Sequence, residues 1–352
     1  MSHPALLELN LRPICPTVIG SAAFPGWYAY FQDQTKANPE RFGPADLQEA
    51  WEDAVRLALE DQVRAGIELV TDGEMGRVDF NLGFYDYLSG IKAQPVPRRL
   101  GAPAHDQRGK YTCVAEIAAP NGLGTMREYR HLKSLTSLPI KMPVPGPFTL
   151  AGRLDGGEIY HDRQAITEAL ILIINAEIHA LIAEGCRYIQ LDEPSFACHP
   201  DNPEIFVDII NRTIAGAGTA YISMHMCFGN FRARAVGHRS YRPLFPGLLK
   251  ANVNQLALEF ASRELSEIEL LKEIVDSGKS VAVGLVDVKN LWVEPVDLIV
   301  DRINTCLGYA PAELIHITPD CGFSQTARYA AVGKMRNLAQ AAKKVRVALR
   351  LA

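Results

Sequence analysis

The sequence has 352 residues, 48% hydrophobic and 22% charged, which is enough to bury the core of one large barrel-type domain or of two smaller domains. The formal net charge of −4 gives no general electrostatic reason to expect nucleic acid or an anionic membrane as a partner, so small molecules are the expected partners. Seven cysteines scattered over the chain lack the pattern of a disulfide framework, which leaves reduced thiols and metal ligation as their roles.

Short β-branched runs alternate with amphipathic stretches, a pattern typical of a parallel sheet wrapped by helices. Eight candidate strands predict an α/β fold of the (β/α)8 barrel type. A doubly wound open sheet has the same alternation, but the strand count and the chain length favour the barrel. The predicted strands are Pro16–Gly20, Glu68–Thr71, Ile140–Val144, Tyr188–Leu191, Ala220–Met224, Gln255–Glu259, Ser280–Val286 and Leu314–Thr318.

Two helices are predicted by apolar residues at three- and four-residue spacing, at Asp46–Ala65 and Arg163–Glu184, and each ends just before a glycine. The stretch from residue 80 to residue 138 breaks the alternation after the second strand. In it, Lys110–Ile117 resembles a strand and Pro95–Asp106 is rich in proline and glycine. We interpret residues 80–138 as an insertion that carries a hairpin within a single catalytic domain, residues 1–352.

The N-terminal segment has no charged region followed by an apolar core, and no stretch approaches about 18 uninterrupted apolar residues. We therefore expect a cytoplasmic protein with no membrane partner. No feature of the sequence indicates an oligomeric state.

Polar residues follow nearly every predicted strand, where catalytic groups lie in a parallel barrel. Because the carboxyl ends of all strands lie on one face of a barrel, these groups are expected to meet there. They include Gly20-Ser21, Asp72-Gly73-Glu74, Asp192-Glu193, His225 with Cys227, Glu259, Asp287 with Lys289, and Asp320-Cys321.

A zinc site is predicted at the last strands. His225 and Cys227 are two residues apart, so they point the same way from one extended segment, and Glu259 and Cys321 arrive from other strands. Two thiolates, an imidazole and a carboxylate suit zinc better than magnesium or calcium. The alternative is a core cysteine beside a hydrogen-bonded histidine, which Glu259 and Cys321 make harder to sustain.

The charge of this ligand set indicates what the metal does. Two cysteinates and one glutamate bring the charge of a zinc site to about −1. Such a site is a poor activator of water but still holds an incoming thiol as a thiolate. The expected reaction is attack of that sulfur on an alkyl carbon.

The motifs resemble the C-terminal catalytic barrel of cobalamin-independent methionine synthase, in a superfamily that also contains uroporphyrinogen decarboxylase. The resemblance covers nearly the whole chain, and the motifs are specific only as a set. They are Thr17-Val-Ile-Gly-Ser21, Asp72-Gly-Glu-Met-Gly-Arg77, Ile189-Gln-Leu-Asp-Glu-Pro194, His225-Met-Cys227, Glu259 and Pro319-Asp-Cys-Gly322.

The resemblance implies roles for individual residues. His225, Cys227, Glu259 and Cys321 would be the zinc ligands. Ile19, Gly20, Ser21, Glu74 and Asp192 would hold the amino-acid part of homocysteine. This agrees with elementary chemistry, because backbone amides and a hydroxyl receive a carboxylate and two acids receive an ammonium group.

Three departures from the family bear on the methyl donor. The chain is too short to hold the second, N-terminal barrel of the full-length enzyme. Arg153 stands where the family places a pterin-stacking tryptophan, and Lys289 stands where it places a histidine proton donor. Lys289 is therefore a candidate catalytic residue, and Asp192 is the other candidate. The methyl or alkyl donor is left open between a folate, a corrinoid and an epoxide.

Three functions remain as hypotheses. The first is zinc-dependent methyl transfer to homocysteine. The second is a zinc-dependent thiol alkyltransferase of the kind that joins coenzyme M to epoxides. The third is a non-catalytic zinc-binding barrel, which the complete ligand set disfavours.

Several other polar residues have structural alternatives. Asp192-Glu193 and Asp320 could cap turns. Asp287 could hold other site residues in place without being catalytic itself. Arg77 with Asp79 could form an ion pair that supports Glu74.

Overall fold

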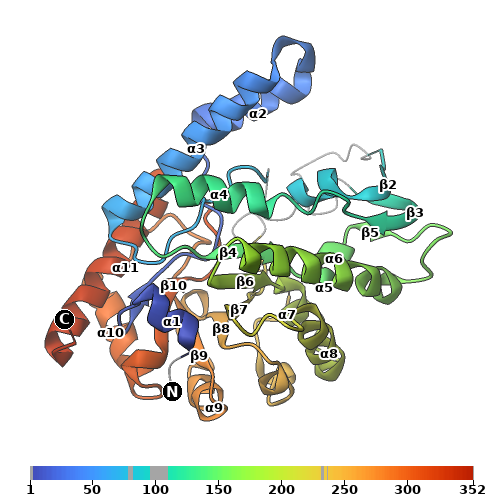
Figure 1. Ribbon diagram of the computed structural model, residues 1–352. Helices are drawn as coiled ribbons and strands as arrows, with labels where there is room; N and C mark the ends of the chain where they lie inside the picture. Colours follow the sequence, from blue (N-terminus) through green and yellow to red (C-terminus); the bar gives the residue numbers. More distant parts are fainter. Residues whose placement is uncertain (1–2, 78–81, 96–109, 231–233, 236, 352) are drawn as a thin grey trace.

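The computed structural model describes residues 3–77, 82–95, 110–230, 234–235 and 237–351. At its centre is a seven-stranded sheet in which every neighbouring pair of strands is parallel, in the order β1-β10-β9-β8-β7-β6-β4 (Figure 1). The strands are β1 (Cys15–Pro16), β4 (Met142–Pro145), β6 (Tyr188–Asp192), β7 (Tyr221–Met226), β8 (Gln255–Glu259), β9 (Ser280–Val286) and β10 (Ile315–Pro319).

The sheet curls, and one short segment links its two edges. Leu69 makes an isolated parallel bridge with Thr17 just after β1, and Val70 makes another with Ile140 just before β4. The prediction of a (β/α)8 barrel is thus confirmed in part, as an α/β fold with a curled parallel sheet. The predicted strand Glu68–Thr71 is present only as these bridges.

Gln62 explains why the segment does not continue as a strand. Its side-chain amide donates to the Thr71 carbonyl at 2.9 Å, and its side-chain carbonyl accepts from the Thr71 amide at 3.0 Å. Both backbone groups of Thr71 therefore have a partner in a helix side chain, and neither needs a partner in a strand ladder. Gln62 is buried.

Helices cover the outside of the sheet (Figure 1). The two long helices that the sequence predicted are present, and their ends agree with the prediction to within two residues. The first is followed directly by Gly66, and the second by the capping residue Glu184 and then Gly185. The α-helices are α1 (Pro4–Leu9), α2 (Gly26–Ala37), α3 (Pro44–Ala65), α4 (Thr125–Leu135), α5 (Pro147–Ala151), α6 (Arg163–Ala183), α7 (Pro194–Cys198), α8 (Pro203–Thr213), α9 (Leu270–Asp276), α10 (Val296–Leu307) and α11 (Arg328–Leu349).

Short 3-10 helices occur in several of the connections between these elements. They are η1 (Pro39–Arg41), η2 (Leu82–Tyr87), η4 (Arg242–Leu244), η5 (Gly247–Lys250), η6 (Ala261–Arg263) and η7 (Ala312–Leu314).

The stretch expected as an insertion contains part of a second, small sheet. Strand β2 (Ser89–Ala93) pairs antiparallel with β3 (Tyr111–Ala118), and β3 pairs parallel with β5 (Leu154–Asp155). The predicted strand Lys110–Ile117 corresponds to β3 within one residue. Most of the proline- and glycine-rich stretch Pro95–Asp106 lies outside the described residues.

Helix α6 has the length and apolar composition of a candidate membrane span, the one such helix in the described part of the chain. It packs against β4 and helices α5 and α8, and Leu170, Ile174 and Ile178 on it are fully buried. Burial within the fold accounts for part of its apolar composition, since 44% of the apolar window is buried.

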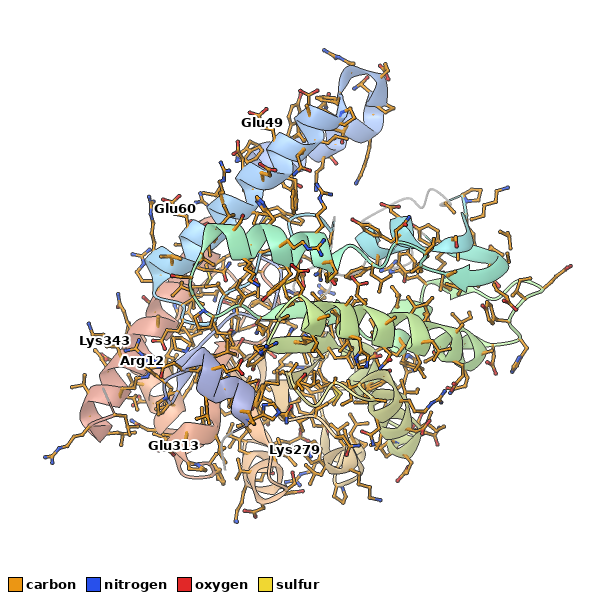
Figure 2. All side chains as sticks on the ribbon, viewed as in Figure 1. Arg12, Glu49, Glu60, Lys279, Glu313 and Lys343 are labelled. Atoms are coloured by element: carbon orange, nitrogen blue, oxygen red, sulfur yellow. The ribbon has the colours of Figure 1, made fainter. Side chains whose placement is uncertain are left out.

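We predict that Gln62→Leu destabilises the protein by about 1–3 kcal/mol, because it leaves a buried backbone donor and acceptor of Thr71 unsatisfied. The measurement is the free energy of unfolding in urea. The control is Glu49→Ala, at an exposed position on the same helix α3 (Figure 2), which should change that free energy by less than about 0.5 kcal/mol. Equal values for the two variants would show that Gln62 does not stabilise the link between the sheet edges.

Candidate functional site

The carboxyl ends of the central strands lie at one edge of the curled sheet. Residues at i and i+2 on one strand face the same side of the sheet. Gln190 and Asp192 therefore share one face of β6, and Ser223 and His225 share one face of β7. The register pairs Asp192 with His225 across the two strands. The sequence therefore brings acids, an imidazole and thiols to one site through the alternation of the strands.

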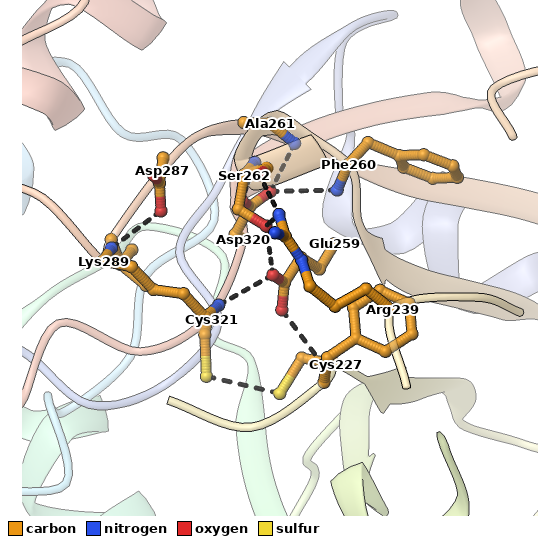
Figure 3. Close-up of polar contacts among 12 residues, drawn as sticks. Cys227, Arg239, Glu259, Phe260, Ala261, Ser262, Asp287, Lys289, Asp320 and Cys321 are labelled. Atoms are coloured by element: carbon orange, nitrogen blue, oxygen red, sulfur yellow. Dashed lines mark hydrogen bonds and ion pairs between the residues drawn. The ribbon is translucent and has the colours of Figure 1, made fainter. Parts of the chain in front are cut away.

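The structure brings together three of the four predicted metal ligands. The ligand atoms of His225, Cys227 and Cys321 all lie within 4.8 Å of one another. The two sulfur atoms are 3.6 Å apart (Figure 3). His225 and Cys227 are buried.

The three groups change each other's proton affinity. The hydrogen bond between the two sulfurs raises the pKa of Cys227 well above its usual value and lowers the pKa of Cys321 well below it. Burial lowers the pKa of His225, but the hydrogen bond to Asp192 and the neighbouring Cys321 sulfur outweigh burial and raise it to about 9. Of the two thiols, that of Cys321 is therefore the one that more readily becomes a thiolate.

The donor set fits a zinc ion. The Asp192 carboxylate accepts a hydrogen bond from Nδ1 of His225 at 3.0 Å, which orients the ring as carboxylates orient metal-binding histidines. The other ring nitrogen, Nε2, is buried and has no hydrogen-bond partner among the described residues. An unpartnered buried nitrogen beside two cysteine sulfurs suits the nitrogen and sulfur preference of zinc.

Glu259, the fourth predicted ligand, lies outside this three-residue group. Its Oε1 accepts a hydrogen bond from Nζ of Lys289 at 2.7 Å and another from the Ser262 hydroxyl (Figure 3). Its Oε2 accepts from the amide of Phe228 at 3.2 Å. In this arrangement the cation that pairs with Glu259 is the ammonium group of Lys289.

Lys289 is held in that ion pair. Burial lowers its pKa, but Glu259 and the thiols of Cys227 and Cys321 raise it above the ordinary value for lysine. The pairing makes Lys289 a weaker acid than an isolated lysine would be. Proton donation by Lys289 would therefore require that its contact with Glu259 be weakened.

The segment Ile19–Ser21 offers free backbone donors, and it lies beside Gly322, the residue after Cys321. None of the amides of Ile19, Gly20 and Ser21 donates a hydrogen bond within the described part of the chain. The Ser21 hydroxyl occupies the space beside Gly322, where it would lie 1.9 Å from an added Cβ. The segment therefore lies against the backbone that follows Cys321.

Glu74 lies on the other side of the same segment. Its Oε1 is 2.3 Å from the position of a Cβ on Gly20, so only glycine allows this approach. Its Oε2 is buried and has no partner among the described residues. Glu74 also has a φ of 55°, which is uncommon for a residue with a side chain and is typical of functional sites.

Arg77 forms an ion pair with Glu74, as in the structural alternative expected for this residue from the sequence. Its Nη1 lies 3.3 Å from Glu74 Oε1, and its other nitrogens bind Glu128 on α4. Burial raises the pKa of Glu74 well above its usual value, against the lowering effect of Arg77. Asp79 lies outside the described residues.

Three acids that follow strands stabilise loops. Glu193 accepts hydrogen bonds from the amides of Phe148 and Thr149 at the start of α5. Asp320 accepts from the amides of residues 260, 261 and 262 after β8. Asp287 accepts from the Lys289 amide at 2.7 Å. In the pair Asp192-Glu193, the side chain of Asp192 contacts the imidazole of His225, whereas Glu193 reaches His225 only through a backbone hydrogen bond to its carbonyl.

Sequence reasoning missed Lys141. This lysine is 2% exposed and lies one residue before β4, where it interacts electrostatically with Asp192 and Glu74. The available signal was a charged residue inside the apolar run Ile140–Val144. Lysine is almost never fully buried without a partner.

Comparisons with known proteins identify the family of the chain. The family described as "Cobalamin-independent synthase, Catalytic domain" matches residues 14–344. The methionine synthase of Pyrococcus abyssi (strain GE5 / Orsay) is 33% identical over 338 residues, which are 95% of this chain and 94% of that protein.

Two solved structures are similar to this one. A B12-independent methionine synthase from Shewanella sp. W3-18-1, in complex with selenomethionine, superimposes with a TM-score of 0.82 at 27% identity, over 97% of this chain and 100% of that one. A putative vitamin-B12-independent methionine synthase from Listeria monocytogenes has the same fold, with a TM-score of 0.71 at 19% identity, over 95% and 98% of the two chains. The resemblance drawn from the motifs is confirmed, and the chain belongs to the cobalamin-independent methionine synthase family, whose catalytic domain it matches over nearly its whole length.

Proposed function

We propose that this protein is a zinc-dependent methyltransferase that transfers a methyl group to the thiol of homocysteine. One observation carries the proposal. Free amides at Ile19–Ser21 and the unpartnered oxygen of Glu74 adjoin a group of one histidine and two cysteines. The site thus offers donors for a carboxylate, an acceptor for an ammonium group and a place for a thiol.

The amino-acid part of the substrate is proposed to bind between the strand ends. The amides of Ile19, Gly20 and Ser21, with the Ser21 hydroxyl, would receive the carboxylate. Glu74 and Asp192 would receive the ammonium group, since charge-assisted hydrogen bonds are the stronger ones in a buried pocket. Glu74 and Asp192 are 2% and 4% exposed, so water would screen their attraction to the ammonium group only weakly.

His225, Cys227 and Cys321 are proposed to hold the zinc ion, with Glu259 as the fourth ligand. When bound, the ion supplies positive charge that stabilises the thiolate form of the acceptor. Asp192 keeps His225 in the orientation that leaves Nε2 free. Glu259 would have to exchange its contact with Lys289 for this role.

Lys289 is proposed as the proton donor to the leaving group once Glu259 has exchanged its contact with Lys289. Transfer from a folate nitrogen needs this proton, whereas transfer from a corrinoid does not. The same ammonium group would favour the alternative function, in which an epoxide accepts the thiol sulfur and its oxygen takes a proton. In either case the partners are small molecules, and we propose that residues 1–352 act as a single catalytic domain in the cytoplasm.

We predict about one equivalent of zinc in the purified protein, held by four ligands. Cys227→Ser and Cys321→Ser should each lose most of it, because a serine hydroxyl is a poor zinc ligand at neutral pH. Metal analysis by mass spectrometry measures this. Cys306→Ser is the control matched to Cys227→Ser, since Cys306 is also buried but lies on α10, and it should keep its zinc. Undiminished zinc in the first two variants would contradict the site.

We predict that the zinc-loaded protein converts homocysteine to methionine when given methyl-folate or methylcobalamin in separate reactions. Lys289→Met should slow the folate reaction on the order of a hundredfold, as expected for loss of a general acid, and should spare the corrinoid reaction. Chromatography of the products measures both rates. A thioether formed only with an epoxide would favour the alternative function, and no thioether with any donor would contradict transfer. Equal slowing with both methyl donors would show that Lys289 acts through its contact with Glu259 and not as the proton donor.

A further inference from the structure

The buried lysine that precedes β4 has a backbone carbonyl as its hydrogen-bond partner. Nζ of Lys141 donates to the carbonyl of Val18, across the interior of the sheet. Burial lowers the pKa of Lys141 to about 7, against the raising effect of nearby acids. The amine donates a hydrogen bond in either protonation state, so the contact with Val18 persists through that titration.

Lys141 belongs to a set of donors that hold one segment of backbone. Every carbonyl from Val18 to Ser21 accepts a hydrogen bond, and each closest donor comes from a different part of the fold. These donors are Nζ of Lys141 for Val18, Nε2 of Gln190 for Ile19 at 3.0 Å, Oγ1 of Thr71 for Gly20 at 2.8 Å and the amide of Phe323 for Ser21 at 2.7 Å.

Thr17 does not replace Lys141 in this set. Its hydroxyl lies 3.3 Å from the Val18 carbonyl, but it lies closer, at 2.8 Å, to the carbonyl of Leu69. A hydroxyl has a single proton to donate, and the geometry gives it to Leu69. Lys141 is thus the donor that holds Val18.

Fixing a carbonyl fixes the amide that follows it. A peptide unit is planar and trans, so the C=O of one residue and the N–H of the next point in opposite directions. The contact with Val18 therefore orients the amide of Ile19, and the contacts with Ile19 and Gly20 orient the amides of Gly20 and Ser21. These three amides are the ones that donate no hydrogen bond among the described residues.

We propose that Lys141 is a positioning residue for substrate binding: by holding the Val18 carbonyl, it aims the Ile19 amide at the carboxylate of the amino-acid substrate. The inference rests on the proposed function, because it takes a carboxylate as the ligand of this segment. Lys141 itself does not touch the substrate in this account. Its effect is to hold the amide in place before the substrate arrives, which lowers the entropy lost on binding.

The test is Lys141→Met, which keeps an unbranched side chain but removes the donor. Binding is measured by calorimetry on the zinc-loaded protein, with homocysteine and with its decarboxylated analogue, which keeps the amine and the thiol. We expect homocysteine to bind about tenfold more weakly, as for one lost hydrogen bond to a charged group, and the analogue to bind within about twofold of wild type. No selective loss for homocysteine would overturn the proposal.

Two further variants separate positioning from damage to the fold. Thr71→Val removes the donor to the Gly20 carbonyl and should reproduce the selective loss, and it stands in for Lys141→Met if that variant does not fold. Cys15→Ala is the control, because Cys15 is also fully buried inside the sheet but does not contact the Val18 carbonyl. The control should bind both ligands as wild type does. A comparable selective loss in Cys15→Ala would assign the effect to general loosening of the interior.

A second measurement needs no substrate. If wild type binds neither ligand, the proposed function fails, and hydrogen exchange over residues 17–24 of the ligand-free protein decides the inference. The amide of Ala22 donates to the Gly73 carbonyl at 3.0 Å, so it reports the order of the held segment. Lys141→Met should raise its exchange rate about tenfold or more, since local opening becomes easier. An unchanged rate would overturn the positioning role.

Discussion

The hydrogen bond between Asp192 and His225 joins the two halves of the site. The same oxygen of Asp192 accepts from Nδ1 of His225 at 3.0 Å and from Nε2 of Gln190 at 2.8 Å. Gln190 also donates to the carbonyl of Ile19. One carboxylate therefore connects the imidazole of the candidate metal site to the backbone proposed to bind the substrate. The parallel register of β6 and β7, which places Asp192 opposite His225, makes this connection possible.

Buried charge is the second constraint on the site. A carboxylate out of water is tolerated only with a cation or several donors nearby. Arg77 accompanies Glu74, and Lys289 accompanies Glu259. Arg77 is in turn held by Glu128, which lies on α4 within the stretch between residues 80 and 138. That stretch thus reaches Glu74, in the proposed substrate pocket, through the ion pairs of Arg77.

Much of this arrangement could be predicted from the sequence, because strand ends and motif residues are local features. The runs that became β8 and β9 were predicted to the residue, and His225 and Cys227 were placed on one face by their spacing alone. The segment Glu68–Thr71 was less predictable, since the side chain of Gln62 satisfies Thr71 from a helix. No strand pattern records a contact of that kind.

The contacts that cross the fold could not be predicted either. Whether Glu259 faces a metal or Lys289 depends on two loops meeting after β8 and β9. The partner of Lys141 depends on the curl of the sheet, which brings β4 and the end of β1 together through residues 69 and 70. In each case the residue type was visible in the sequence, but the partner was set by tertiary register.

The central claim is that an amino-acid thiol binds with its sulfur at the group formed by His225, Cys227 and Cys321. X-ray absorption at the zinc edge, recorded with and without selenohomocysteine, tests this most directly, because selenium is a distinct scatterer. The account predicts a selenium neighbour of zinc that appears on adding the ligand and is absent without it. A zinc spectrum unchanged by saturating ligand would contradict it.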